Sequence, residues 1–124
     1  MGYNFNDETP IYLQIIENIK IRIISKEYLP QQKLPSVRDL SLEYEVNPNT
    51  IQKALSELEN SGLIFTERTN GKYVTDNEKL ISDVRSQTIR KMVDDFYVAM
   101  AKIGLEKEDV LEILNGKGIE RWKF

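Results

Sequence analysis

Apolar residues recur at helical spacing in five stretches of the chain, which short polar segments separate. The first stretch runs from residue 10 to about residue 26, and we expect Thr9 to cap this helix and Pro10 to be its first residue. The run Tyr28-Leu29-Pro30 ends it, because the residue before a proline is pushed out of the α region. Its broad apolar face consists of Ile11, Leu13, Ile15, Ile16, Ile19 and Ile23.

Two shorter helices follow the first. Ser36 is a good N-cap for the second helix, whose inward residues are expected to be Val37, Leu40 and Tyr44. Asn47 is a good N-cap for the third helix and Pro48 a good first residue. The third helix ends at Gly62 and carries on one face Ile51, Ala54, Leu55 and Leu58. Two short helices joined by a tight turn are the outline of a helix-turn-helix.

After Gly62 the pattern changes to one typical of strands. Residues 63–67 and 72–75 are β-prone, and the segment between them contains Asn70-Gly71. Asn-Gly between two β-prone runs is the strongest short-range signal for a hairpin, and Asn70 can adopt the positive φ that its turn needs. A hairpin directly after a recognition-type helix would be a wing.

The helical period returns at about Asn77 and continues to Gly104, and a last short helix covers residues 105–114. This tail is too short to make a core of its own, so we expect a second copy of the chain to cover it. The predicted dimer core consists of Ile89, Met92, Val93, Phe96, Met100, Ile103, Leu111 and Leu114. Phe96 and Tyr97 could line either the dimer seam or a small cavity between tails. Trp122 and Phe124 are expected to dock on another part of the protein.

The predicted fold is therefore mainly α with a small β-hairpin wing. It divides into a winged helix-turn-helix DNA-binding domain, residues 1–76, and a helical dimerisation tail, residues 77–124. A chain of 124 residues is long enough for one such domain with an appendage.

Composition excludes several classes of function. The chain has no Cys and no His, which removes thiol nucleophiles, Cys/His zinc sites, imidazole bases and disulfides. It has no phosphate-binding glycine loop and no nucleophile–base pair, so we expect neither an enzyme nor a cofactor. No apolar run approaches the roughly 20 residues of a membrane span, and the N-terminus lacks signal-peptide character. We expect a cytoplasmic protein that has no contact with membranes.

Three motifs resemble the GntR family of bacterial transcription regulators when taken together. The motifs, in order, are Pro10-Ile11-Tyr12-Leu13-Gln14, then Lys33-Leu34-Pro35-Ser36-Val37-Arg38-Asp39-Leu40, then Val46-Asn47-Pro48-Asn49-Thr50-Ile51-Gln52-Lys53-Ala54-Leu55, which runs on to Leu58-Glu59-Asn60-Ser61-Gly62-Leu63-Ile64. The short helical tail is similar to that of the YtrA subfamily. The resemblance implies a homodimeric regulator, a repressor of an operon such as one of transporter genes, bound to double-stranded DNA at a pseudo-palindromic operator. It identifies no small-molecule effector.

Two features depart from the family pattern. The family usually has a glycine where the first helical region ends and a Pro-Gly before the Leu-Pro-Ser motif, where this chain has Ser25-Lys26-Glu27 and Pro30-Gln31. The family wing usually has two glycines, and this one has only Gly71. The contacts of the wing are therefore the part of the resemblance that carries over least directly.

The third helix opens with polar residues and has no acid from residue 47 to residue 56. In a helix-turn-helix, the N-terminal end of this helix meets the base edges. Asn49 and Gln52 can pair with adenine, Thr50 can meet a thymine methyl, and Lys53 suits phosphate or guanine. We expect Asn47 to cap the helix first of all, with a DNA contact as the alternative.

Further candidate contacts lie outside the third helix. In the family, the arginine at the position of Arg38 reaches DNA, and the resemblance implies the same contact here. The alternative for Arg38 is a surface ion pair with Asp39 or Glu43. The hydroxyl of Ser36 can cap its helix while that helix end meets a phosphate. Positive charge around this face would come from Lys33, Arg68 and Lys72.

The net charge weakens the case for DNA binding. At −3 it gives no overall attraction to nucleic acid, so binding must come from the local arrangement of side chains. Glu67 beside Arg68 also disfavours a phosphate at the wing. The alternative class is a protein-interaction module, built on a winged helix that has no significant affinity for DNA.

Overall fold

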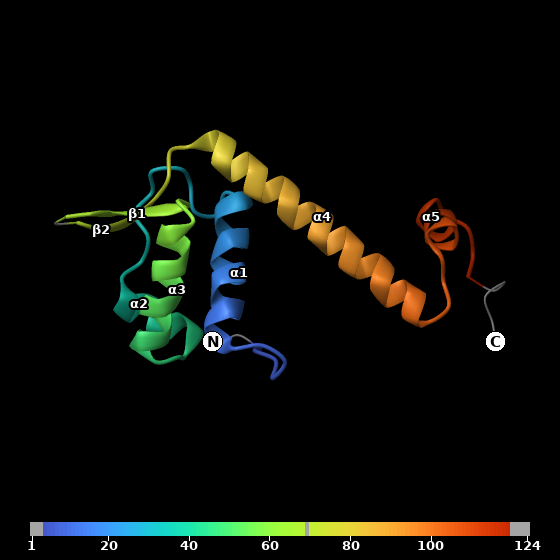
Figure 1. Cartoon of the computed structure of the whole chain (residues 1–124), viewed down its shortest axis with the longest axis horizontal. Coiled ribbons are helices and arrows are strands. Elements are labelled where there is room, and N and C mark those ends of the chain that lie inside the picture. Colours follow the sequence, from blue (N-terminus) through green and yellow to red (C-terminus); the bar gives the residue numbers. More distant parts are fainter. Residues whose placement is uncertain (1–3, 69, 120–124) are drawn as a thin grey trace. The chain divides into compact units, whose positions relative to one another are not determined.

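The computed structural model describes residues 4–68 and 70–119, so the predicted docking of Trp122 and Phe124 lies outside the described residues. Two compact units divide the chain, residues 1–84 and residues 85–124, and each is described by itself. The elements are labelled in Figure 1 and are α1 (Ile11–Ile24), α2 (Val37–Tyr44), α3 (Pro48–Asn60), β1 (Ile64–Glu67), β2 (Gly71–Val74), α4 (Glu78–Lys102) and α5 (Lys107–Leu114). Mainly helical structure with one two-stranded hairpin confirms the predicted fold class.

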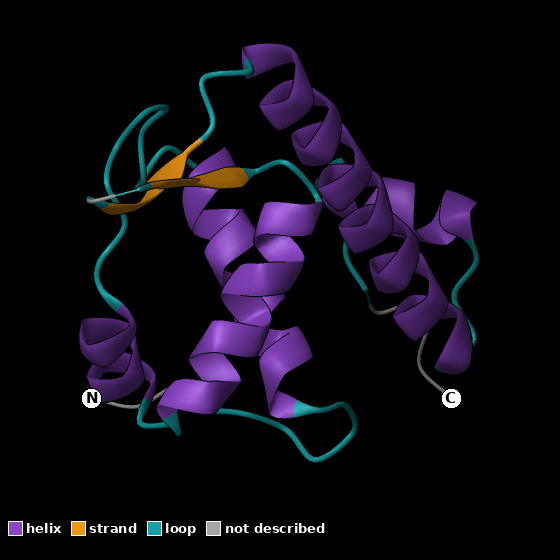
Figure 2. Ribbon diagram, turned by 60° about the vertical axis from the view of Figure 1, so that its left-hand side comes forward, coloured by secondary structure: helices purple, strands orange, loops and turns teal. Residues whose placement is uncertain are grey.

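A closed apolar core holds the first unit together. The helix α3 packs against α1, α2 and β1 (Figure 2). Ile81, at the start of α4, belongs to the same core. The largest side chains that are fully buried are Tyr44, Ile15, Ile19, Ile23, Leu40, Ile51, Leu55, Leu58, Leu63, Ile64 and Val74. Every element of the unit contributes to this core, which fixes the positions of α2, α3 and the hairpin relative to one another.

The start of α1 differs from the prediction. Pro10 is the N-cap, with no side-chain cap, and the helix begins at Ile11. The amide of Gln14 donates to the carbonyls of Asn6 (2.9 Å) and Thr9 (2.9 Å), and its Oε1 accepts from the Asn6 backbone N–H at 3.1 Å. The predicted cap by Thr9 is therefore wrong, because Gln14 folds the preceding segment onto the helix instead. Two residues of the predicted apolar face, Ile11 and Leu13, are exposed.

The end of α1 comes earlier than predicted, at Ile24. Lys26 has a φ of 68°, and the Tyr28 N–H donates to the carbonyl of Arg22 at 2.9 Å. A left-handed residue just after a helix ends it, whatever follows. The turn therefore stops the helix before Pro30 can. Gln31 also has a positive φ, 66°. The two segments before α2 where the family usually has a glycine therefore each contain a left-handed residue.

The caps of α2 and α3 are confirmed. The Ser36 hydroxyl accepts from the Asp39 N–H at 3.0 Å, and the Asn47 Oδ1 accepts from the Asn49 N–H at 2.8 Å. Between the two helices, Glu45 turns the chain in a left-handed conformation with a φ of 57°. The chain therefore makes a helix-turn-helix with a short, defined turn.

The hairpin pairs β1 with β2 in an antiparallel register that sets Ile64 opposite Val74 and Thr66 opposite Lys72. In the turn, Gly71 has a positive φ of 97°, and the positive φ expected for Asn70 stays a prediction. Before α2, the segment 31–34 runs beside β2, because the Gln31 N–H donates to the Val74 carbonyl at 2.9 Å and the Leu34 N–H to the Lys72 carbonyl at 2.8 Å. Thus the hairpin has backbone support along one edge.

The second unit is smaller and less closed. It comprises most of α4 and all of α5, joined by Gly104 at a φ of 90°. The helix α5 begins at residue 107 rather than at the predicted 105, because Asp109 Oδ2 accepts from the Glu106 N–H at 3.0 Å and fixes the start there. Leu105 and Val110 are the large apolar residues buried in the described part of this unit. None of the described helices is long and apolar enough to cross a membrane.

Candidate DNA-binding face

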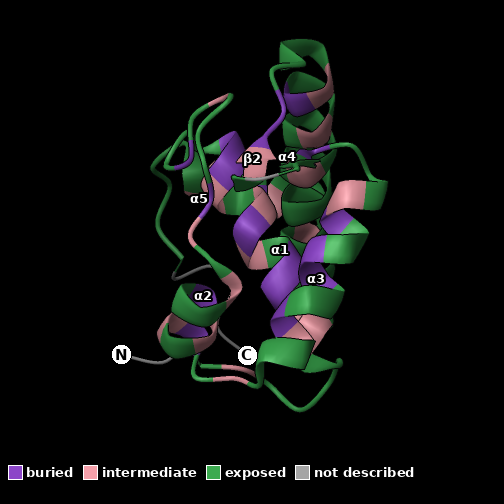
Figure 3. Ribbon diagram, turned by 90° about the vertical axis from the view of Figure 1, so that its left-hand side faces the viewer, coloured by how far each residue is buried: buried purple, intermediate pink, exposed green. Residues whose placement is uncertain are grey.

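The first two turns of α3 present polar side chains to solvent. Asn49, Gln52 and Lys53 are exposed, and Thr50 is half-buried. Within the described chain, neither Asn49 nor Gln52 makes a side-chain hydrogen bond. Figure 3 shows α2 and α3 with exposed outer surfaces and buried residues where each meets the core. Side chains that are exposed and unpaired at the start of this helix are available to a partner.

The two capping residues lie at the edge of this face. Asn47 and Ser36 each use a side-chain oxygen to cap a helix, and both are exposed. The Asn47 amide still has its NH₂ and the Ser36 hydroxyl still has its proton, so each can donate to an oxygen outside the chain. Capping and contact are thus compatible at both positions.

Arg38, on the first turn of α2, is exposed and has no ion pair among the described residues. Of the two acids that could have paired with it, Glu43 is held by Arg22 at 2.6 Å. Asp39 forms no ion pair with Arg38 either. The guanidinium is therefore free to make a bidentate contact with phosphate or guanine.

Lys53 rests on an aromatic ring. Its Nζ lies 4.0 Å from the centroid of the Tyr12 ring, which the start of α1 provides. A hollow of about 390 Å³ beside this pair is lined by Ile11, Tyr12, Asn49, Thr50 and Lys53. A cation–π contact restricts the lysine while leaving its ammonium hydrated. The sequence alone did not predict this contact, because no local signal joins residues 41 positions apart.

The two basic residues that the sequence assigned to the wing differ in whether they have a partner. Arg68 is exposed near the tip, whereas Lys72 is engaged, with its Nζ 2.7 Å from Glu59 Oε1 and 2.8 Å from Thr66 Oγ1. Hydrogen bonds from Lys72 and Thr66 lower the pKa of Glu59, which keeps this carboxylate ionised. Glu59 therefore holds Lys72, which the sequence placed among the sources of positive charge around the face.

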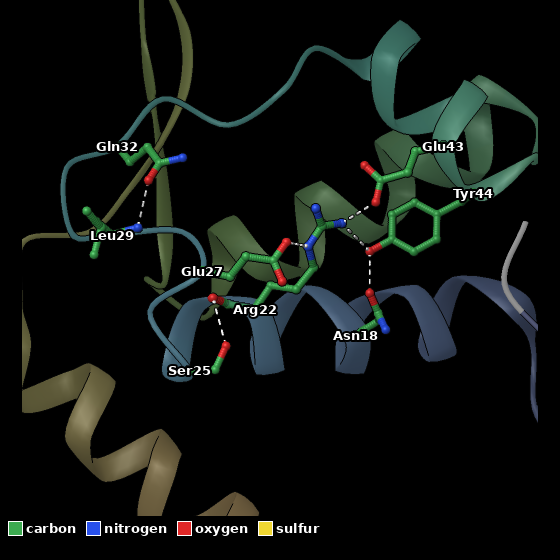
Figure 4. A network of polar contacts seen from close by, with 8 residues as sticks. All are labelled: Asn18, Arg22, Ser25, Glu27, Leu29, Gln32, Glu43 and Tyr44. Carbon is green, nitrogen blue, oxygen red and sulfur yellow. Dashed lines mark hydrogen bonds and ion pairs between the residues drawn. The ribbon is translucent and has the colours of Figure 1, made fainter. Parts of the chain in front are cut away.

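A polar network behind the face connects α1 to α2 (Figure 4). Arg22 donates to Glu27 (2.7 Å), Glu43 (2.6 Å) and the Tyr44 hydroxyl (3.2 Å), and the Tyr44 hydroxyl donates to Asn18. Burial alone lowers the pKa of Arg22, but the hydrogen bonds to Tyr44 and Glu43 raise it above its ordinary value, so the charge persists. Sequence reasoning missed this network, since its partners come from separate helices.

The predicted dimer residues lie on the second unit. Met100 is half-buried, and the others are between 42% and 65% exposed: Phe96, Val93, Leu111, Ile89, Met92, Ile103 and Leu114. Tyr97 lines a separate hollow of about 570 Å³ between α4 and α5, where Lys107 lies 5.4 Å from its ring centroid. No group of carboxylates in residues 4–68 and 70–119 is arranged to hold a metal ion.

Comparison with known sequences gives consistent matches. The family described as bacterial regulatory proteins, gntR family, matches residues 11–74. An uncharacterized HTH-type transcriptional regulator of Bacillus subtilis (strain 168), YhcF, is 38% identical over 112 residues, which cover 90% of this chain and 93% of YhcF. The HTH-type transcriptional repressor YtrA of the same organism is 38% identical over 105 residues, which cover 80% of this chain and 78% of YtrA.

Solved structures agree with these matches. A GntR family transcriptional regulator from Listeria monocytogenes is similar over 92% of this chain and 100% of its own, with a TM-score of 0.80 and 36% identity. The DNA-binding domain of AraR, in complex with operator ORR3, is similar over 60% of this chain and 88% of its own, with a TM-score of 0.53 and 32% identity.

Proposed function

This chain belongs to the GntR family of bacterial regulatory proteins, and from that membership we propose that it is a homodimeric repressor that reads a pseudo-palindromic operator. It is a DNA-binding transcription regulator, as are its relatives. Residues 1–76 bind DNA in this proposal, and residues 77–124 join two copies.

The single observation that carries the proposal is the exposed start of α3. Asn49 and Gln52 have no side-chain partner in the described chain, and Lys53 is oriented by Tyr12 beside them. AraR, which has a similar DNA-binding domain, is bound to an operator. We assign DNA contacts to eight residues: Ser36, Arg38, Asn47, Asn49, Thr50, Gln52, Lys53 and Arg68. Lys72 is not among them, because Glu59 holds it.

The exposed apolar residues of the tail support dimerisation. A stripe at positions 89, 92, 93, 96, 100 and 103, together with Leu111 and Leu114, supports a self-complementary seam. Two recognition helices related by a two-fold axis read half-sites about one helical turn apart. The protein in this proposal works in the cytoplasm, has no catalytic activity, and represses an operon that includes transporter genes.

The test is binding to the promoter region upstream of the chain's own gene. We expect a mobility shift at low salt and a steep loss of affinity as salt rises, since each neutralised phosphate releases counterions. A duplex of the same length and shuffled sequence is the control and should bind more weakly. The protein-interaction module, which the net charge of −3 favours, predicts no shift at low salt with either duplex. That outcome would overturn the proposed function.

A further inference from the structure

The hairpin has an inner face and an outer face. Ile64 and Val74 are buried on the inner face, and their neighbours at period two, Thr66 and Lys72, share it. Phe65 stacks on Tyr73, with ring centroids 5.8 Å apart, on the opposite face. The side chain of Lys72 is therefore directed by the strand towards α3.

Glu59, on the last turn of α3, closes a polar triangle with these two residues. Lys72 Nζ donates to Glu59 Oε1 at 2.7 Å and to Thr66 Oγ1 at 2.8 Å, and the Thr66 hydroxyl donates to Glu59 Oε2 at 2.9 Å. Both oxygens of the carboxylate are engaged. The side chain of Lys72 is 28% exposed, whereas that of Lys79, in a surface pair, is 84% exposed.

We propose that Glu59 and Lys72 are positioning residues that fix the wing to the end of the recognition helix, so that Lys72 serves DNA binding through Glu59 rather than through a phosphate. This inference rests on the proposed function. It replaces the direct contact that the sequence suggested for Lys72, and it assigns a role to Glu59, which was not among the candidate contact residues.

A short hairpin needs support at its base. A two-stranded hairpin is marginal by itself, so the direction of its tip depends on how its base is held. Thr66 and Lys72 both donate to Glu59, and within the described chain these are the side-chain hydrogen bonds that join α3 to the strands. The tip carries Arg68, which is exposed. Moving the base would move Arg68 relative to the start of α3.

Charge also favours a closed pair. If Lys72 turned away to meet a phosphate, the carboxylate of Glu59 would be left beside the wing without its cation. An unpaired acid near DNA is repelled by phosphate, and the hydrogen bonds of a partly buried carboxylate are costly to lose. Keeping the pair closed avoids both penalties.

The experiment uses the full chain and a duplex that the wild-type protein selects from a randomised DNA pool. Three variants test the pair: Glu59→Met, Lys72→Met, and the charge-swapped double variant Glu59→Lys/Lys72→Glu. Glu57→Met is the matched control, because it removes the same charge from an exposed position on the same helix. Thermal unfolding of each variant shows whether the fold is retained.

We expect Glu59→Met and Lys72→Met each to weaken binding by about three- to tenfold, the range for the loss of one ordinary hydrogen bond, because the pair acts on DNA only indirectly. The two losses should be similar, and the charge-swapped variant should recover most of the affinity. The slope of affinity against salt should stay unchanged in Lys72→Met. Glu57→Met should bind at least as tightly as the wild type.

Other outcomes overturn the inference. If Lys72 contacts phosphate, Lys72→Met lowers the slope of affinity against salt by about 1. In that case Glu59→Met tightens binding, and the charge-swapped variant does not recover the affinity. If the pair only stabilises the fold, melting temperatures fall while affinity at low temperature stays at the wild-type value. Selection of no duplex by the wild-type chain would instead refute the proposed function, and this inference with it.

Discussion

The two units of the chain differ in what they do with their apolar residues. In residues 4–84 most isoleucines and leucines are buried in one core, and Ile15, Ile19 and Ile51 have no exposed surface. In the described part of the second unit, most large apolar side chains stay exposed, with Ile103 at 61% and Leu114 at 65%. A contiguous apolar surface on a small soluble protein marks an interaction site.

The difference separates two sources of stability. The winged helix obtains its core from its own chain, so its polar face can be altered without loss of the fold. The described part of the tail buries little of its own apolar surface, which a second copy covers in the proposed dimer. Substitutions in the two units should therefore have different effects.

Truncating an apolar side chain should destabilise the fold most in the closed core of the first unit. Ile19→Ala should lower the free energy of unfolding of the first unit by about 2–5 kcal/mol, because it leaves a cavity between α1 and α3. Ile103→Ala in the tail should change the same quantity by less than about 0.5 kcal/mol. Hydrogen exchange of amides in α1 and α3 measures both effects. Equal losses from the two variants would contradict the contrast.

A charge in the tail should act on assembly rather than on folding. Phe96→Asp would bury an unpaired carboxylate in the seam, which is costly, so we expect a folded monomer. Operator affinity should fall by about 100-fold or more once the two half-sites are no longer bound together.

Sedimentation decides this prediction, with Gln87→Asp as the control. Gln87 is exposed and lies nine residues before Phe96, which places it on the opposite side of the helix, so the same charge there should leave a dimer. If Phe96→Asp still sediments as a stable dimer, the seam is elsewhere.

On the recognition helix, Gln52→Ala should reduce specificity. We expect a loss of about 1–3 kcal/mol at one or two base positions, with the fold intact, because a bidentate base contact is removed. Binding to a set of single-substituted duplexes measures the pattern. Ser56→Ala, one turn further along α3, is the control. A uniform loss over all duplexes would reassign Gln52 to the DNA backbone.

Arg38→Ala should weaken binding several-fold while thermal stability stays at the wild-type value. The reason is that Arg38 is exposed and unpaired in the described chain, so only the DNA contact is lost. Lys79→Ala removes the same charge from α4 and should have a smaller effect. Unchanged affinity in Arg38→Ala would remove this residue from the face.

The smallest effect concerns turns. The tail uses Gly104 and Gly116 at positive φ, whereas the first unit uses Lys26 after α1. Lys26→Gly should raise the free energy of unfolding by about 0.5–1 kcal/mol, because glycine adopts this conformation without strain. Lys26→Ala keeps the Cβ and should give no gain. Urea denaturation compares the two, and an equal gain from both would show that the charge matters instead.

Much of the fold could be predicted from local patterns. Helical spacing placed the five helices, and the side-chain chemistry of Ser36 and Asn47 correctly predicted their caps. Asn70-Gly71 located the turn of the hairpin, where Gly71 has a positive φ. These features depend on neighbours within a few residues, where the physical preference is strong.

Contacts between distant segments could not be predicted. Thr9 has the residue type of an N-cap, but the side chain of Gln14 donates to the carbonyls of Asn6 and Thr9. Capping propensities of single residues do not include such bonds. The sequence around Lys72 does not show that its ammonium donates to Glu59, because this acid lies on α3. The candidate face was predicted by residue type and position. Which of its side chains are engaged depends on tertiary packing, which spacing does not encode.

The bonds between Gln14 and the segment that precedes α1 have a practical consequence for labelling. They tie residues 6–9 to the beginning of that helix, and the same helix start lines a hollow with Asn49 and Lys53. A fluorophore attached to Glu8 is therefore held close to the start of the recognition helix and is poorly suited to binding measurements. A reporter on Ser25, which is exposed at the other end of α1, is about 20 Å further along the helix axis.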